Sequence, residues 1–167
     1  MEYRASLDTL SRMITAGTIL LFIILGYGSV RSQDKNMVSN ISLYSVIIIF
    51  LFLVIIIGSY LYSTEKYIVE NGELVIKGPA KERRIRIADI TEARLLESAE
   101  TKMIRIFGVG GLFGYYGRYY SSSLGKITQY ASQRRNKILL HTSDSESIII
   151  TPDDIGLLNL LQIAKPK

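Results

Sequence analysis

Hydrophobic residues concentrate in two long stretches near the start of the chain. Residues 46–57 read V-I-I-I-F-L-F-L-V-I-I-I without one polar side chain, inside an uncharged stretch from 41 to 62. A second uncharged stretch covers residues 13–30. As helices they would be about 33 Å and about 27 Å long, against about 30 Å of hydrocarbon in a bilayer. The pattern predicts a membrane α-hairpin over residues 13–62, with spans 13–30 and 41–62, after a head of residues 1–12.

Two other interpretations of these stretches stay open. Each could be the buried core helix of a soluble protein, although such helices rarely run so long without a charge, because one face usually meets water. The first could also be a cleaved signal peptide, although its apolar run exceeds the usual length and no A-x-A-like cleavage site is present. β-branched residues are frequent, but in lipid only helices or closed barrels satisfy the backbone.

Lysine and arginine counts near the two stretches predict the orientation. The loop between them carries Arg31 and Lys35, and the head carries Arg4 and Arg12. Five more cations follow the second stretch, namely Lys66, Lys77, Lys81, Arg83 and Arg84. We therefore expect an integral protein of a bacterial or archaeal cell membrane, with two spans and both termini in the cytoplasm. Its partners would be the lipid bilayer and a second protein.

Residues 65–167 are expected to form a separate, mainly β domain. The dipeptide Asn71-Gly72 between two apolar runs is a strong hairpin signal, because both residues accept positive φ. Further along, Ile85 and Ile87 alternate with Arg84 and Arg86, which places the two kinds of side chain on opposite faces. About seven short antiparallel strands, packed as a sandwich or barrel, are expected over residues 66–70, 73–77, 83–87, 90–96, 126–131, 137–142 and 147–151.

The chain changes character after the last expected strand. Thr151 can cap a helix, Pro152 suits a first helical position, and the carboxylates of Asp153 and Asp154 suit a first turn. The helix that begins there is expected to continue over residues 155–164. Strands closed by one amphipathic C-terminal helix are the order found in pleckstrin-homology-type barrels, where the helix caps one open end.

The most unusual segment is residues 107–123, F-G-V-G-G-L-F-G-Y-Y-G-R-Y-Y-S-S-S. We call it the Gly-aromatic segment. It could be a phosphate-cradling loop, although the usual glycine spacings are missing. It could instead be a membrane-surface loop, with its rings at the interface and Arg118 near a lipid phosphate, or an insertion whose rings complete the core. The candidate binding residues are Gly108, Gly110, Gly111, Phe113, Gly114, Tyr115, Tyr116, Gly117, Arg118, Tyr119 and Tyr120.

Four pieces of the chain together carry a family resemblance. They are R-I-F-G-V-G-G-L-F-G-Y-Y-G-R-Y-Y from Arg105, L-G-K-I-T-Q-Y-A-S from Leu124, I-L-L-H-T from Ile138 and I-I-I-T-P-D-D from Ile148. They resemble the bacterial pleckstrin-homology-like (PH-like) domain family, in which a Gly-rich R-x-x-G-x-G-G-x-F-G-Y-x-G stretch precedes G-x-x-x-x-Y-A-[ST]. The resemblance covers residues 66–164. It implies a PH-like barrel with a C-terminal capping helix, often behind a membrane hairpin, and it implies no activity.

Candidate chemistry is sparse along the rest of the chain. There is no cysteine and only one histidine, His141, which excludes thiolate and histidine-rich metal sites. Acids, bases and nucleophiles do not converge in any pattern, and the net charge of +5 comes without a nucleic-acid-binding motif. We therefore expect no enzymatic activity, no metal, no cofactor and no nucleic-acid partner.

The leading functional interpretation is a non-enzymatic, membrane-anchored binding or scaffold module that contacts a protein partner or an anionic lipid surface. An accessory subunit of a transporter or channel complex, and a membrane enzyme completed by a partner subunit, are the alternatives. Neither apolar stretch holds an acidic or basic residue that would favour transport. The densest basic run is Lys81, Arg83, Arg84 and Arg86, which we expect to contact lipid headgroups on one surface with the Gly-aromatic segment.

Overall fold

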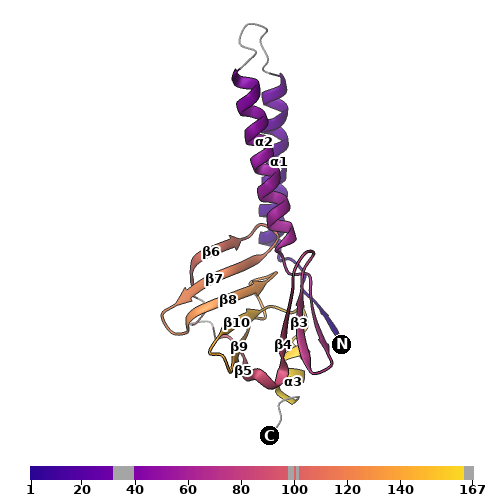
Figure 1. Ribbon diagram of the computed structural model, residues 1–167, viewed down its shortest axis with the longest axis vertical. Coiled ribbons are helices and arrows are strands. Elements are labelled where there is room, and N and C mark those ends of the chain that lie inside the picture. The colour runs from indigo at the N-terminus through magenta and orange to yellow at the C-terminus, as the bar shows by residue number, and fades with distance from the viewer. Residues whose placement is uncertain (32–39, 98–99, 101, 164–167) are drawn as a thin grey trace.

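The computed structural model describes residues 1–31, 40–97, 100 and 102–163. Two long helices stand side by side over a domain made of two β-sheets and a third helix (Figure 1). The helices are α1 (Thr9–Arg31), α2 (Asn40–Leu61) and α3 (Gly156–Ile163). Between α1 and α2 the rings of Phe22 and Phe52 stack, with their centroids 4.0 Å apart. The two long helices therefore pack on each other through apolar side chains.

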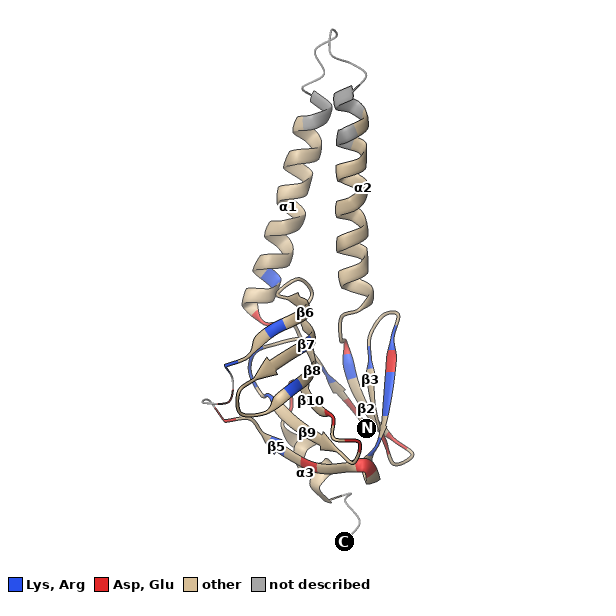
Figure 2. Ribbon diagram, turned by 60° about the vertical axis from the view of Figure 1, so that its left-hand side comes forward, with Lys and Arg blue, Asp and Glu red and all other residues tan. Residues whose placement is uncertain are grey.

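Apolar side chains are exposed along both long helices. The window Thr9–Gly28 of α1 is long and apolar enough to cross a membrane, and the described part of α2 contains a shorter apolar stretch, Val46–Leu61. Ile23 of α1 and Phe50 of α2 are 62% and 67% exposed. Between Arg12 near the foot of α1 and Arg31 at its last position, and along all of α2, the helices carry no charged residue, as Figure 2 shows for the parts that it colours. An apolar surface of this extent is unusual on a protein surrounded by water.

The strands form two sheets (Figure 1). The first has the order β1-β2-β3-β4 and is antiparallel throughout. The second has the order β5-β9-β10-β8-β7-β6, with β10 parallel to β8, and the short 3-10 helix η1 (Ile87–Asp89) leads from β4 into β5. The strands are β1 (Glu2–Arg4), β2 (Lys66–Glu70), β3 (Glu73–Lys77), β4 (Glu82–Arg86), β5 (Ile90–Leu95), β6 (Ile104–Gly110), β7 (Tyr115–Ser121), β8 (Gly125–Ala131), β9 (Ile138–Thr142) and β10 (Ser147–Ile150).

The mainly β domain with a C-terminal helix is confirmed, but the predicted closed barrel of about seven strands is not present. Asn71 and Gly72 turn between β2 and β3 with φ of +50° and +77°, as the hairpin signal predicted. No ladder joins the two sheets within the described residues. The physical reason is that the Gly-aromatic segment is not a loop. It forms β6, β7 and the turn between them, and so extends the second sheet outward instead of closing it onto the first.

The N-terminal head contributes a strand to the domain. β1 pairs with β2 in antiparallel register, with Tyr3 opposite Tyr67, and the terminal ammonium of Met1 donates to the carbonyl oxygen of Val69 at 2.7 Å. Ser6 continues this contact, because its amide and hydroxyl both donate to the carboxylate of Asp153. The domain is therefore assembled from residues that lie on both sides of α1 and α2 in the sequence.

The core has two parts, one on each face of the second sheet. Residues of β9 and β10 alternate between them: Leu140 and Ile148 face the first sheet, whereas Leu139 and Ile149 face the opposite side, and all four are fully buried. The first part also receives Leu157, Leu158 and Leu161 of α3, which therefore closes one side of the space between the sheets. This confirms that the C-terminal helix packs on the β-domain.

The predicted start of that helix is wrong. α3 begins at Gly156, whose amide donates to the carboxylate of Asp154, and not at Pro152. Thr151 does not cap it. Instead its hydroxyl oxygen accepts from the amide of Ser132 at 3.0 Å, which fixes the end of β8. Asp153 is likewise engaged by the N-terminal segment, so tertiary contacts use the residues that a local capping pattern assigned to the helix.

Asp8 joins the foot of α1 to the second sheet. Its carboxylate accepts the amide of Ser11 at 2.7 Å, which caps α1, and the side chain of Arg134 at 3.0 Å. Burial alone would raise the pKa of Asp8, but the Ser11 amide and the Arg134 guanidinium outweigh it and lower the pKa below its ordinary value.

Replacing Asp8 by Asn should lower the stability of the protein at neutral pH, and this loss should depend on pH. Asn caps a helix as well as Asp does, so the change removes mainly the ion pair, at a cost of about 1 kcal/mol near pH 7. The folded-state pKa is depressed, so the stabilisation is present above the unfolded-state pKa and disappears as the pH falls through the folded-state pKa. Urea titrations of the detergent-solubilised chain should show the gap at pH 7, and the gap should shrink as the pH falls below the ordinary pKa of an aspartate. The Asp144→Asn change in an exposed turn serves as the control, and an unchanged gap at acidic pH would contradict the assignment.

Candidate functional site

A groove of about 990 Å³ opens between the two sheets at the foot of α2. One wall comes from β3 and the start of β4, and the other from β6, β7 and β8. Val54, Ile55 and Gly58 of α2 line it at the helix end. The groove occupies the opening that the unclosed barrel leaves, so its position follows directly from the outward extension of the second sheet.

Cations line this groove from both walls. Lys81 and Arg83 belong to the first wall, whereas Arg105 of β6 and Arg118 of β7 belong to the second. Glu82 is the one acidic residue in the same lining, and its carboxylate pairs with Arg84. Among the described residues, neither Lys81 nor Arg118 has a carboxylate partner. The groove is therefore a positive space enclosed largely by apolar atoms.

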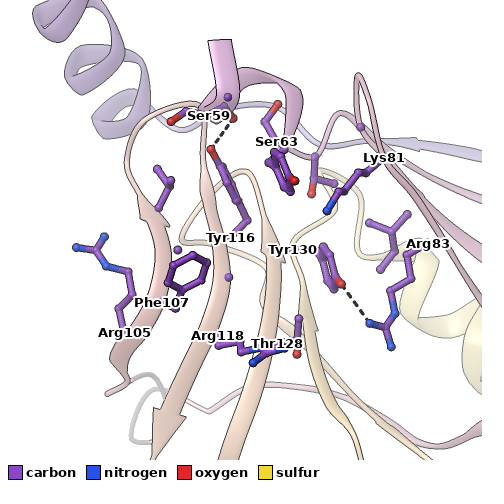
Figure 3. A pocket seen from close by; sticks show the side chains of 18 of the residues that line it. Ser59, Ser63, Lys81, Arg83, Arg105, Phe107, Tyr116, Arg118, Thr128 and Tyr130 are labelled. Atoms are coloured by element: carbon purple, nitrogen blue, oxygen red, sulfur yellow. Dashed lines mark hydrogen bonds between the residues drawn. The ribbon is translucent and has the colours of Figure 1, made fainter. Parts of the chain in front are cut away.

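Aromatic rings hold two of these cations in place. The ammonium of Lys81 lies 3.9 Å from the centre of the Tyr62 ring, and the guanidinium of Arg83 donates to the hydroxyl of Tyr130 at 3.2 Å (Figure 3). Arg83 also forms an ion pair with Glu146 at the rim. Burial alone would lower the pKa of Arg83, but the contacts with Tyr130 and Glu146 outweigh it and raise the pKa above the ordinary value. Arg83 thus stays charged at any physiological pH.

The basic run divides between two faces of β4. Lys81 and Arg83 face the groove, but Arg84 and Arg86 lie on the outer face, where Arg84 pairs with Glu82 and Glu73 and Arg86 pairs with Asp89. The expected single surface of four cations is therefore corrected to two. The alternation that places Arg83 on the face of Ile85 is visible in the sequence and could have separated them.

The Gly-aromatic segment forms the second wall rather than a loop. Phe107, Gly108, Tyr116, Gly117 and Arg118 line the groove from β6 and β7. The hydroxyl of Tyr116 donates to the carbonyl oxygen of Ser59, which fastens this wall to the last turn of α2 (Figure 3). Burial raises the pKa of the Tyr116 hydroxyl, so it remains a hydrogen-bond donor.

The rest of the segment lies elsewhere and serves the connection to the helices. Ser11 of α1 donates to the carbonyl oxygen of Gly111, and the amide of Phe113 donates to the hydroxyl oxygen of Thr15 at 3.0 Å. The Phe113 ring meets the edge of Tyr60 at 5.5 Å between centroids. Of the remaining candidates, Tyr115 donates to Asp8, and Gly110 and Gly114 flank the turn. Tyr119 packs in the second core part, and Tyr120 is exposed.

Several groove residues had no signal in the sequence. Ser59, Tyr62 and Ser63 belong to the end of α2 and the residues directly after it. Thr128 and Tyr130 belong to an ordinary strand. Only the pairing of distant strands brings these side chains together, so no local pattern could have grouped them.

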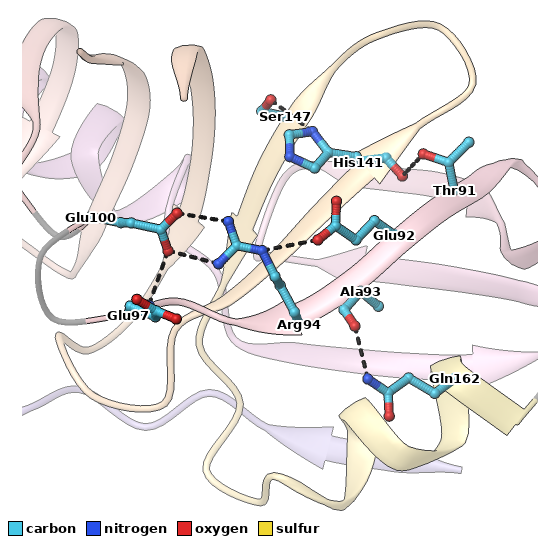
Figure 4. A network of polar contacts seen from close by, with 9 residues as sticks. All are labelled: Thr91, Glu92, Ala93, Arg94, Glu97, Glu100, His141, Ser147 and Gln162. Carbon is cyan, nitrogen blue, oxygen red and sulfur yellow. Dashed lines mark hydrogen bonds and ion pairs between the residues drawn. The ribbon is translucent and has the colours of Figure 1, made fainter. Parts of the chain in front are cut away.

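A second polar cluster lies on β5 and β9, away from the groove. Arg94 forms a two-pronged ion pair with Glu100, with both oxygen–nitrogen distances at 2.7 Å, and a further contact with Glu92 (Figure 4). Hydrogen bonding from Arg94, and then from the Glu97 amide, lowers the pKa of Glu100 to about 2. His141 nearby contacts the hydroxyl of Ser147 at 3.1 Å. Arg94 pairs with both Glu92 and Glu100, so we interpret the cluster as structural.

Comparison with known proteins identifies the domain. Residues 65–162, more than half of the chain, match the family model described as a bacterial PH domain. No curated protein and no solved structure matches. The matched region begins directly before β2 and ends within α3. It therefore contains the strands of both groove walls, but not α2.

Proposed function

Because the chain belongs to the bacterial PH domain family, we propose that it is a non-enzymatic binding module held at a membrane surface by α1 and α2, with the groove as its binding site. The observation that carries this proposal is the position of the groove. Its walls join the family's domain to the last turns of α2, whose apolar side chains are exposed. A ligand in the groove would therefore touch both the anchor and the domain.

The pairing of β1 with β2 supports two crossings. α1 contains a window suited to a membrane span, and a chain that crosses once must cross again before β2 can pair with β1. α2 has 22 residues, about 33 Å of helix, which is enough for the return. A single span or a cleaved first helix would separate β1 from the sheet that it completes.

The same pairing supports a cytoplasmic domain. With the head and the residues after α2 on the same side of the membrane, Arg4 and Arg12 would add to the five cations named above after α2. Against these seven, the loop between the helices carries Arg31 and Lys35. Positive charge marks the cytoplasmic side of a membrane protein.

Labelling of single cysteines should test this arrangement, since the natural chain has no cysteine. We expect a membrane-impermeant maleimide to label Asn36→Cys, which lies between α1 and α2 in the sequence, on intact cells. The same reagent should label Ser122→Cys, exposed beside β7, only after lysis. The protein should also stay in the membrane fraction after alkaline carbonate washing. Labelling of Ser122→Cys on intact cells would reverse the orientation, and release by carbonate would contradict the anchor.

One observation favours a protein partner as a second candidate. β6 pairs only with β7 among the described strands, and its edge carries Ile104 and Phe107, which are 74% and 77% exposed. An exposed apolar edge can accept a strand from another chain. Crosslinking from Ile104→Cys in native membranes should then join the chain to a second protein, whereas the exposed position Ser143→Cys should not.

A further inference from the structure

We infer that the groove binds one anionic phospholipid from the adjoining leaflet, with the phosphate among Lys81, Arg83 and Arg118 and an acyl chain against α2 and Phe107. This inference rests on the proposed anchoring of α1 and α2. It names a ligand, which the family match does not, and it places that ligand between the sheets.

The charge of the groove calls for an anion. Four basic residues line it among those described, but the Arg105 guanidinium contacts Tyr119, so the charge that faces the groove comes from Lys81, Arg83 and Arg118. Lys81 and Arg118 come from opposite walls, and neither has a carboxylate partner in the described part of the chain. Arg83 also forms an ion pair with Glu146, a residue that does not line the groove. A phosphate diester offers oxygens that guanidinium and ammonium groups bind strongly.

The apolar lining calls for a hydrocarbon chain beside that anion. Ile106 and Phe107 are 60% and 77% exposed where they line the groove, and Figure 3 shows Phe107 on the wall that also carries Tyr116. A free inorganic phosphate would leave these side chains uncovered. The volume of about 990 Å³ is also far larger than one ion needs, and it lies at the upper end of the range for small-molecule sites.

The position of the apolar end favours a lipid over an acidic peptide. Val54 and Ile55 lie about 9–11 Å along the helix axis from Leu61, the last residue of α2, which places them at acyl-chain depth when α2 spans the membrane. A peptide that reached them would carry unpaired backbone groups into hydrocarbon. A lipid reaches them without leaving the leaflet.

Lipid retention by the full chain should test the inference. The wild-type protein is purified in a neutral detergent, mixed with phosphatidylglycerol or phosphatidylcholine, and analysed by native mass spectrometry. We expect one phosphatidylglycerol to be retained and phosphatidylcholine to be retained far less. The Lys81→Gln, Arg118→Gln double variant should weaken retention about 30-fold, as expected for the loss of two cations beside an anionic lipid.

The matched control removes the same charge from the other face of β4. Arg84→Gln, Arg86→Gln should retain phosphatidylglycerol as the wild type does, because both arginines face away from the groove. Equal retention of both lipids, equal losses in the two double variants, or displacement by inorganic phosphate, glycerol phosphate or poly-glutamate would overturn the inference. A carbonate wash of the source membranes, before detergent is added, keeps the tests apart: a chain that stays in the membrane but shows no such retention refutes only the lipid site.

Discussion

Replacing Tyr67 by Ala should remove most of the stability of the β-domain. Tyr67 of β2 is fully buried between the sheets, and truncation of a large buried aromatic side chain costs about 3–5 kcal/mol. Its hydroxyl donates to the carbonyl oxygen of Tyr130 at 2.7 Å and accepts the amide of Thr151 at 3.0 Å. The buried Thr151 amide would be left without this partner, which adds about 1–3 kcal/mol. Small domains have only about 5–15 kcal/mol in total.

Urea titration of the full chain in detergent, followed by far-UV circular dichroism, should measure this loss. Tyr120→Ala is the matched control, because Tyr120 is 47% exposed and its truncation should change stability by no more than about 0.5 kcal/mol. Tyr67→Phe separates the two contributions, since it keeps the ring and removes only the hydroxyl, at about 1–3 kcal/mol. If Tyr67→Ala cost no more than Tyr120→Ala, the proposed link between the sheets would be refuted.

The same hydroxyl gives the wild type a loss of stability in alkali. Burial raises the pKa of Tyr67 well above that of an exposed tyrosine. A raised folded-state pKa means that the stabilisation is complete below the unfolded-state pKa of about 10 and declines as the pH rises beyond it. Titrations at pH 9 and pH 11 should show that decline to be smaller in Tyr67→Phe.

The sequence pattern predicted the elements whose signals are local. The Asn71-Gly72 turn, the alternation around Ile85 and the apolar character of α3 each depend on neighbouring residues, and each is present in the fold. β1 carried no such signal. It has three residues, and its partner β2 follows only after both long helices, so the pairing is visible only in the folded chain.

The strands β6 and β7 were not predicted from the sequence, for a different reason. Glycine is rare in strands, so the Gly-aromatic segment looked like a loop, although β6 and β7 run through most of it. The groove could not be predicted either, because it forms between two sheets whose strands are distant in the sequence. Its cations were visible in the sequence, but only tertiary structure shows that Arg83 and Arg118 share a space and that Arg84 does not.

Gly108 and Gly117 face each other across β6 and β7, and this pair explains why the second wall needs glycine. Their φ values are +125° and +128°, in a region that other residues rarely adopt. A Cβ on Gly117 would overlap the carbonyl oxygen of Phe107, and a Cβ on Gly108 would overlap that of Tyr116. The two backbones therefore approach as closely as glycine alone permits.

Gly117→Ala should consequently cost about 4 kcal/mol, from about 1–3 kcal/mol of backbone strain and a similar cost of steric overlap. Gly125→Ala is the control: Gly125 also has a positive φ, +70°, but its added Cβ would meet no atom within 4 Å, so only about 1 kcal/mol is expected. Urea titration of the two variants separates the contributions: Gly117→Ala measures backbone strain together with steric overlap, and Gly125→Ala measures backbone strain alone. Equal costs would mean that β6 and β7 separate easily at this point. The glycines would then be better explained by a ligand that approaches the backbone than by the close pairing of the two strands.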